Sequence, residues 1–166
     1  MARTMYDAIG QNAAAVPSDA DLVAGYDQGG FAWTTAEWDR FPKAAHVRIA
    51  TLTIDWRGAS VIDSEVGALS PAQCRKFIIE RDEFRAGTAT VYRDRSGLPQ
   101  LLKACAGLSY DLWLAWWIGH APSPEEIASV EAVLPAGVQL VAWQHTNMGA
   151  YDVSAVLDDD WHPEPR

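Results

Sequence analysis

Val61-Ile62-Asp63-Ser64-Glu65 begins as a short apolar run and ends with two carboxylates that are separated by one residue. On a β-strand, successive side chains alternate between faces, so Asp63 and Glu65 are expected to point the same way. Each carboxylate raises the pKa of the other, and one of them can then stay protonated. Many glycosidases use such a pair for catalysis. The structural alternative is a strand end that carries two acids into solvent.

Seven other short apolar runs recur along the chain, with helical or irregular stretches between them. Several of these runs are continuous rather than alternating, which is typical of strands buried on both faces, as in parallel sheets. The eight predicted strands lie near residues 4–8, 21–27, 46–52, 60–64, 89–93, 111–117, 138–144 and 151–156.

The helix starts are marked by capping boxes, in which a Ser or Thr is followed three residues later by Glu or Gln. Proline stands at the first helical position of two of these helices, where the missing N–H is harmless. The three boxes are Thr34 with Glu37, Ser70 with Gln73, and Ser123 with Glu126. The predicted helices run from Pro71 to about Arg85, over 98–106, and from Pro124 to about Ala132, whereas 9–20 and 53–60 have no regular pattern.

This alternation of strands and helices predicts an α/β protein with βαβ units and a parallel sheet. Eight strands without a glycine-rich phosphate loop favour a closed barrel over an open nucleotide-binding sheet. A typical (β/α)8 barrel needs about 250 residues. We therefore predict that residues 1–166 form a single domain, a compact, irregular (β/α)8 TIM-like barrel with shortened or missing helices. A doubly wound open sheet is the alternative.

The composition sets further bounds. The 166 residues are 49% hydrophobic, which suits one globular domain, and the formal net charge is -9 without a basic patch, so nucleic acid is not an expected partner. No apolar run reaches the roughly 18 residues of a membrane span, and no signal peptide is evident. Cys74 and Cys105 are expected as buried thiols, and the histidines lack metal-ligand spacing, so neither a metal nor a cofactor is predicted.

Acidic residues gather at the predicted strand ends. In (β/α)8 barrels, the active site lies at the carboxyl ends of the strands. Asp27 is followed by Gly29 and Gly30 and fits a turn. The remaining acids, Asp7, Asp63, Glu65 and Asp152, are the candidate catalytic residues.

The order of several short motifs resembles glycoside hydrolase family 25, the lysozyme-type muramidases. The motifs are Tyr6-Asp7, Val61-Ile62-Asp63-Ser64-Glu65, Val91-Tyr92, Leu112-Trp113-Leu114-Ala115, Trp143-Gln144-His145-Thr146 and Tyr151-Asp152-Val153. The chain is also similar to small barrel domains related to that family, which actinobacteria and their phages encode. This resemblance covers nearly the whole chain.

The resemblance implies a role for each matching residue. Glu65 matches the general acid of the family. Asp63 matches the partner of that acid, which orients the acetamido group of the substrate or a water molecule. Asp7 and Asp152 match the flanking acids. Tyr92, Trp113 and Gln144 match positions that line the sugar cleft, and Tyr26 and Trp117 are further candidates for substrate binding. At Trp117 the family usually has a tyrosine, whose hydroxyl is lost here.

Two functions follow from this reading. The first is a phage-encoded N-acetylmuramidase that acts on the glycan strands of peptidoglycan, either in the host cytoplasm before lysis or as part of a virion. The second is a non-catalytic tail or baseplate barrel that has a structural or glycan-binding role among other virion proteins. A different small-molecule enzyme on the same fold also remains open.

Overall fold

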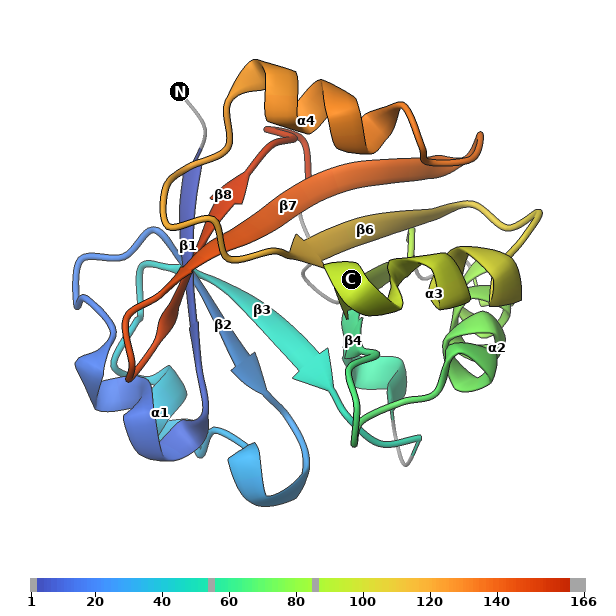
Figure 1. Cartoon of the computed structure of the whole chain (residues 1–166). Helices are drawn as coiled ribbons and strands as arrows, with labels where there is room; N and C mark the ends of the chain where they lie inside the picture. Colours follow the sequence, from blue (N-terminus) through green and yellow to red (C-terminus); the bar gives the residue numbers. More distant parts are fainter. Residues whose placement is uncertain (1–2, 54–55, 85–86, 162–166) are drawn as a thin grey trace.

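The computed structural model describes residues 3–53, 56–84 and 87–161. Within these ranges, eight strands form a closed barrel in the sequential order β1 to β8 (Figure 1). Each predicted strand is present, with its ends shifted by a few residues, and the open-sheet alternative is wrong. The strands are β1 (Arg3–Ala8), β2 (Leu22–Tyr26), β3 (Ala45–Ala50), β4 (Val61–Asp63), β5 (Thr90–Asp94), β6 (Tyr110–Ala115), β7 (Val138–Asn147) and β8 (Asp152–Val156).

The barrel is mixed rather than fully parallel. Neighbouring strands from β1 to β7 are parallel, but β8 is antiparallel to both β7 and β1, so the prediction of a parallel sheet is wrong for this strand. The reason is the length of the connection between β7 and β8, which is closed by a hydrogen bond from Met148 N to Tyr151 O. Four residues can form a hairpin but not the crossover that parallel strands require.

The helices cover the barrel unevenly. The three predicted helices are confirmed as α2 (Pro71–Glu83), α3 (Leu98–Ala104) and α4 (Pro124–Glu131), and all three capping boxes are formed. Arg85, the predicted end of α2, lies outside the described residues. No helix in the described ranges is long and apolar enough to cross a membrane. The remaining helical segments are short: α1 (Thr35–Trp38), η1 (Gly10–Ala15), η2 (Gly29–Phe31), η3 (Trp56–Gly58) and η4 (Arg95–Gly97).

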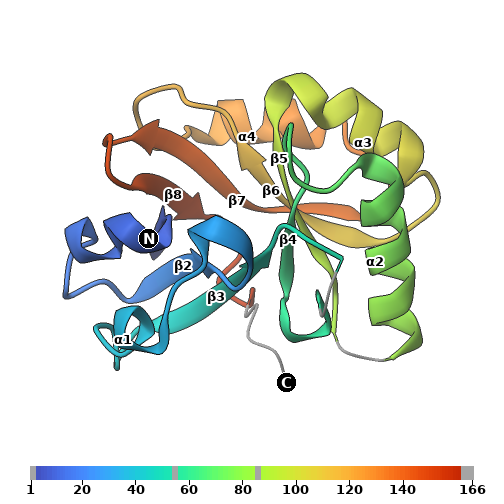
Figure 2. The ribbon, with the colours of Figure 1, turned by 90° about the horizontal axis from the view of Figure 1, so that it is seen from below.

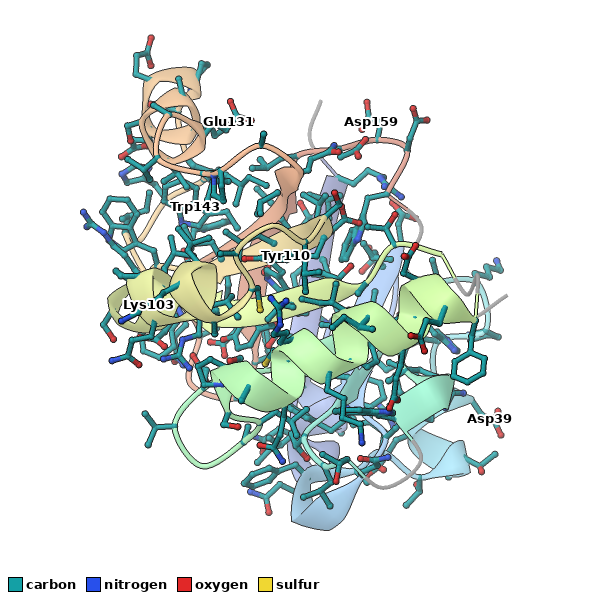
Figure 3. All side chains as sticks on the ribbon, turned by 90° about the vertical axis from the view of Figure 1, so that its right-hand side faces the viewer. Asp39, Lys103, Tyr110, Glu131, Trp143 and Asp159 are labelled. Carbon is teal, nitrogen blue, oxygen red and sulfur yellow. The ribbon has the colours of Figure 1, made fainter. Side chains whose placement is uncertain are left out.

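The apolar residues form a core inside the barrel and two layers outside it. Inward side chains such as Met5, Val61 and Trp113 fill the interior. A larger layer packs beneath α2, α3 and α4, and Figure 3 shows α2 and α3 lying across this face. A smaller layer built on Trp33 and Trp38 lies beneath η1 and α1, on the opposite side of the barrel (Figure 2). Most strands are thus buried on both faces, as their continuous apolar runs indicate.

Trp161 closes the end of the barrel at which the parallel strands begin. Its side chain is 5% exposed, and its indole Nε1 donates to the Thr90 hydroxyl at 3.1 Å. Arg3 holds the same segment by donating to the carbonyl oxygens of Asp158, Asp159 and Trp161. With this end filled, the opposite mouth is the accessible end of the barrel.

Candidate active site at the mouth of the barrel

The four predicted acids come together at that mouth. Asp7 is near the carboxyl end of β1 and Asp63 is the last residue of β4. Asp152 reaches the same end because β8 runs in reverse and begins there, directly opposite Asp7 in register. The electrostatic influence of Asp152, Glu65 and Asp63 on Asp7 shows that the four carboxyls share one site.

The alternating pattern predicts that Glu65 lies on the strand with Asp63, but in the structure Glu65 lies beyond the end of the strand. β4 ends at Asp63, and a turn follows in which Ala68 N donates to Glu65 O. The Asp63 carboxyl shapes this turn, because its Oδ1 accepts from the backbone N–H of Glu65 at 2.8 Å. Asp63 is 6% exposed, whereas Glu65 is only partly buried. One carboxyl is therefore fixed by the backbone and the other is available at the surface of the site.

Burial and mutual repulsion keep protons on these acids. Burial, and to a smaller extent the neighbouring carboxyl of Asp152, raise the pKa of Asp7 to about 8. Burial, and to a smaller extent the carboxyl of Asp63, raise the pKa of Glu65 to about 7. Burial alone raises the pKa of Asp152 to about 6. Burial also raises the pKa of Asp63, but the Glu65 N–H and the Tyr26 hydroxyl donate to it and favour its anion. The site thus combines two carboxyls that keep a proton to near neutral pH, those of Asp7 and Glu65, with Asp63, at which hydrogen bonds oppose the effect of burial.

Gln144 is the centre of a buried hydrogen-bond network. It is 1% exposed, and its Nε2 donates to both carboxyl oxygens of Asp7, at 3.0 and 3.2 Å. Its Oε1 accepts from the Tyr92 hydroxyl at 3.0 Å and from the Trp117 indole at 2.6 Å. Because Tyr92 also bonds to Glu65, the network joins the two protonated acids.

The predicted aromatic residues take different positions. Trp117 is 60% exposed and, although β6 ends before it at Ala115, its indole N–H reaches Gln144. Tyr26 lines the mouth beside Asp7. Trp113 is fully buried and donates to Ser154 Oγ at 3.0 Å, so it packs beneath the site rather than facing a ligand.

A pocket of about 200 Å³ opens beside Asp7 and Asp152. Its wall also includes Asn12 and Asn147, and Asn147 bonds to Asp152. Neither asparagine belongs to a pattern that would have pointed to the site. A larger groove of about 750 Å³ lies beside β2 and β3, away from the acids. Two of its charged groups, Arg48 and Asp27, already pair with each other at 2.8 Å, so the smaller pocket, which Asp7 and Asp152 line, is the better candidate.

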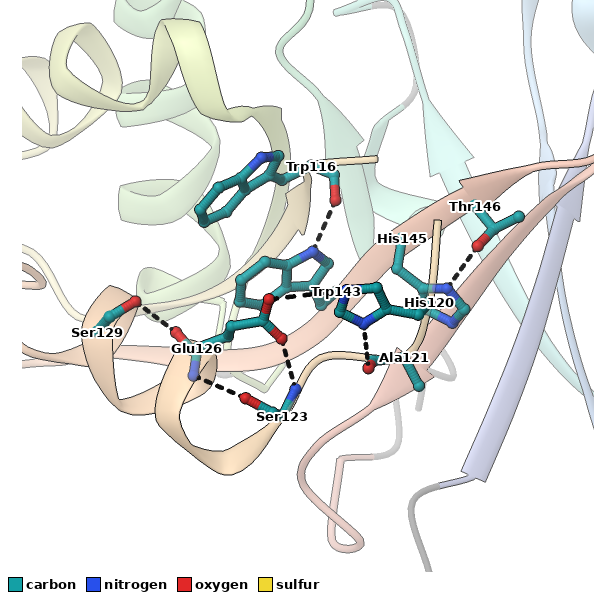
Figure 4. Close-up of polar contacts among 9 residues, drawn as sticks. All are labelled: Trp116, His120, Ala121, Ser123, Glu126, Ser129, Trp143, His145 and Thr146. Atoms are coloured by element: carbon teal, nitrogen blue, oxygen red, sulfur yellow. Dashed lines mark hydrogen bonds and ion pairs between the residues drawn. The ribbon is translucent and has the colours of Figure 1, made fainter. Parts of the chain in front are cut away.

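His145 lies beside Gln144 in sequence but does not join the acids. Its Nδ1 bonds to Thr146 Oγ1, and His120 contacts Glu126 in the capping box of α4 (Figure 4). The Trp143 indole donates to Trp116 O on the outer face of the barrel. In the described ranges, no group of three or more His, Cys, Asp or Glu side chains is arranged to hold a metal ion.

Comparison with known proteins finds no matching family model, no similar curated protein and no similar solved structure.

Proposed function

We propose that the protein is a glycoside hydrolase of the N-acetylmuramidase type that cuts peptidoglycan glycan strands, and that its barrel is an irregular relative of the (β/α)8 fold of glycoside hydrolase family 25. The observation that carries this proposal is the pairing of Glu65, whose pKa is raised to about 7, with the buried Asp63. A glycosidic oxygen is a poor leaving group until it is protonated, so a neutral carboxyl beside an anionic one suits this reaction.

In the proposed mechanism, Glu65 donates its proton to the oxygen of the scissile bond. The bond between this oxygen and the anomeric carbon breaks, and Asp63 stabilises the positive charge that develops on the sugar ring, directly or through the acetamido group. A water molecule then adds to the anomeric carbon and gives its proton to a carboxylate of the site. The hydrogen bonds from the Glu65 N–H and Tyr26 hold Asp63 in place for this role. Asp7, held by Gln144, forms the opposite wall, and the exposed ring of Trp117 offers a face on which a sugar can stack.

A second candidate is a virion barrel that binds glycan or assembles with other virion proteins without turnover. The size of the pocket favours it, since about 200 Å³ is below the roughly 300 Å³ at which ligand sites usually begin. The net charge of -9 also opposes approach to an anionic cell wall. An enzyme with these properties would act best when a particle holds it at the wall, where tethering raises its local concentration.

The test is incubation of the purified protein with actinobacterial peptidoglycan, followed by assay of new reducing ends. The matched control is Glu65→Gln, which keeps the shape of the side chain and removes its proton. The hydrolase proposal expects reducing ends from the native protein alone. Sedimentation with the wall without any release, both free and in the native particle, would support the binding barrel instead.

A further inference from the structure

Phe31 carries an exposed aromatic ring at the mouth of the barrel. Its side chain is 54% exposed, and the centroid of its ring lies 6.0 Å from that of Tyr26, the last residue of β2. Tyr26 packs on the barrel interior and lines the pocket beside Asp7 and Asp152. One side chain, that of Tyr26, thus links the ring of Phe31 to the pocket of the acids.

The backbone that carries Phe31 is fixed, although the ring is exposed. Trp33 N donates to Tyr26 O at 2.8 Å and folds this segment back onto the end of β2. The buried Trp33 indole donates to Ala8 O at 2.8 Å and ties the segment to the end of β1. Gly10 allows this close approach, since a Cβ there would lie 2.4 Å from a backbone oxygen of the same segment. A ring on a fixed backbone loses little conformational freedom when it binds a ligand.

Trp117 stands on the opposite side of the same mouth. The barrel closes in the order β1 to β8, so β2 and β6 are four strands apart in either direction. Phe31 follows β2 and Trp117 follows β6, each beyond the carboxyl end of its strand. Eight strands that are about 4.8 Å apart and tilted by about 40° enclose a barrel roughly 15 Å across. A ligand that contacts both rings must therefore be longer than a single sugar.

The line between the two rings divides the acids into two groups. Asp7 and Asp152 belong to β1 and β8, on one side of this line. Asp63 and Glu65 lie at and just beyond the end of β4, on the other side. A linear chain that follows this line passes between the two groups and has carboxyls on each flank.

We propose that Phe31 is a specificity-determining residue that stacks on a sugar of a linear glycan, and that this glycan lies across the mouth from Phe31 to Trp117. The proposal rests on the proposed function only in its choice of a glycan and not on hydrolysis. A sugar has an apolar C–H face that can stack on an aromatic ring, and its hydroxyls can bond to the carboxyls between the rings. A polymer that lies across the mouth does not need to enter the pocket of about 200 Å³.

A partner protein is the alternative occupant of this surface. Leu52, Val66 and Met148 are also exposed, just beyond the ends of β3, β4 and β7. The centre of a protein interface is depleted of charged residues, however, whereas the centre of this mouth consists of carboxyls. The polar centre between two aromatic rings favours the glycan.

The experiment measures the binding of N-acetylglucosamine oligomers of two and six units by calorimetry, in Glu65→Gln protein so that no bond is cut. The six-unit oligomer is expected to bind more tightly than the two-unit one. Phe31→Ala and Trp117→Ala should each weaken its binding about 5- to 10-fold, and the double substitution by the product of both effects. The two-unit oligomer cannot reach both rings, so at most one of the two substitutions should weaken its binding.

Three further variants separate stacking from other effects. Phe31→Tyr keeps an aromatic face and should bind both oligomers like its parent. Phe31→Leu keeps apolar area without that face, and it should bind the six-unit oligomer as weakly as Phe31→Ala does. Phe84→Ala is the matched control, because Phe84 is 60% exposed at the end of α2, which leads away from the mouth to the start of β5. It should change neither affinity.

Unchanged binding of the six-unit oligomer by Phe31→Ala would overturn the inference, as would failure of this oligomer to bind more tightly than the two-unit one. Full binding by Phe31→Leu would also overturn it, because it would assign Phe31 to a simple apolar contact, as with a partner protein. The outcome is separable from the proposed function. The predicted binding without release of reducing ends by the native protein removes the hydrolase and leaves this inference intact, whereas hydrolysis that is independent of Phe31 does the reverse.

Discussion

Asp7 and Asp152 face each other directly in the antiparallel register of β1 and β8. Like charges in such a pair destabilise a sheet. Burial and this neighbour together raise the pKa of Asp7 to about 8, so near neutral pH the repulsion is relieved by a proton. The reversal of β8 thus accounts both for the place of Asp152 at the mouth and for part of the protonation of Asp7.

This pair predicts that the stability of the fold depends on pH. Between about pH 4 and pH 8, the unfolded chain releases the Asp7 proton while the folded protein keeps it, so stability falls as the pH rises and levels off above pH 8. Glu65 and Asp152 act in the same direction up to about pH 7 and pH 6. Urea denaturation at pH 5, 7 and 9 measures the slope. Asp7→Asn should flatten the slope of stability against pH and stabilise the protein by about 1–2 kcal/mol at pH 8. An equal slope in the native protein and in the variant would contradict this account.

Glu65→Gln should abolish hydrolysis without destabilising the fold. Glutamine has no proton to donate to the leaving oxygen, and its neutral amide removes a repulsive contact with Asp63. The melting temperature is therefore expected to stay the same or to rise. Unchanged turnover would remove Glu65 from the acid role, and a large loss of stability would make it part of a structural network.

Trp117 should contribute to activity on polymeric wall through both its ring and its indole N–H, and two substitutions separate these contributions. Trp117→Phe keeps an aromatic face but removes the hydrogen bond to Gln144, whereas Trp117→Ala removes both. We expect kcat/KM on polymeric wall to fall about 10-fold in the alanine variant and less in the phenylalanine variant. Because the side chain is 60% exposed, the melting temperature of each should change little. Equal activity in all three proteins would exclude a sugar platform here.

Trp161 should matter for stability and not for activity. Trp161→Ala empties a buried position at the closed end of the barrel and should cost about 3 kcal/mol in free energy of unfolding. Trp161→Phe keeps a ring and loses only the bond to Thr90, which should cost about 1 kcal/mol. Urea denaturation measures both. Wall activity per folded molecule is expected to be unchanged, and a selective loss of activity would show that the two ends of the barrel are coupled.

The strands, the capped helices and the gathering of the acids could be predicted because each rests on a local signal. Continuous apolar runs marked the strands, and Ser70 with Gln73 or Ser123 with Glu126 marked the helix starts. Asp7 and Asp63 could be placed at one mouth because parallel strands end together.

Other features depend on contacts between distant parts of the chain. The reversal of β8 depends on how a four-residue connection closes, which apolar runs do not reveal. The network of Gln144 joins residues from β1, β5 and the segment after β6, more than 25 positions away along the chain.

The most direct test of the central claim is chemical identification of the sugar at any new chain end. Peptidoglycan treated with the protein is reduced with borohydride, hydrolysed and analysed for the alcohols of the two amino sugars. A muramidase predicts an excess of the alcohol of muramic acid, which is absent with Glu65→Gln. An excess of glucosaminitol would contradict the assigned bond, and no excess of either alcohol, with the protein bound to the wall, would contradict hydrolysis itself.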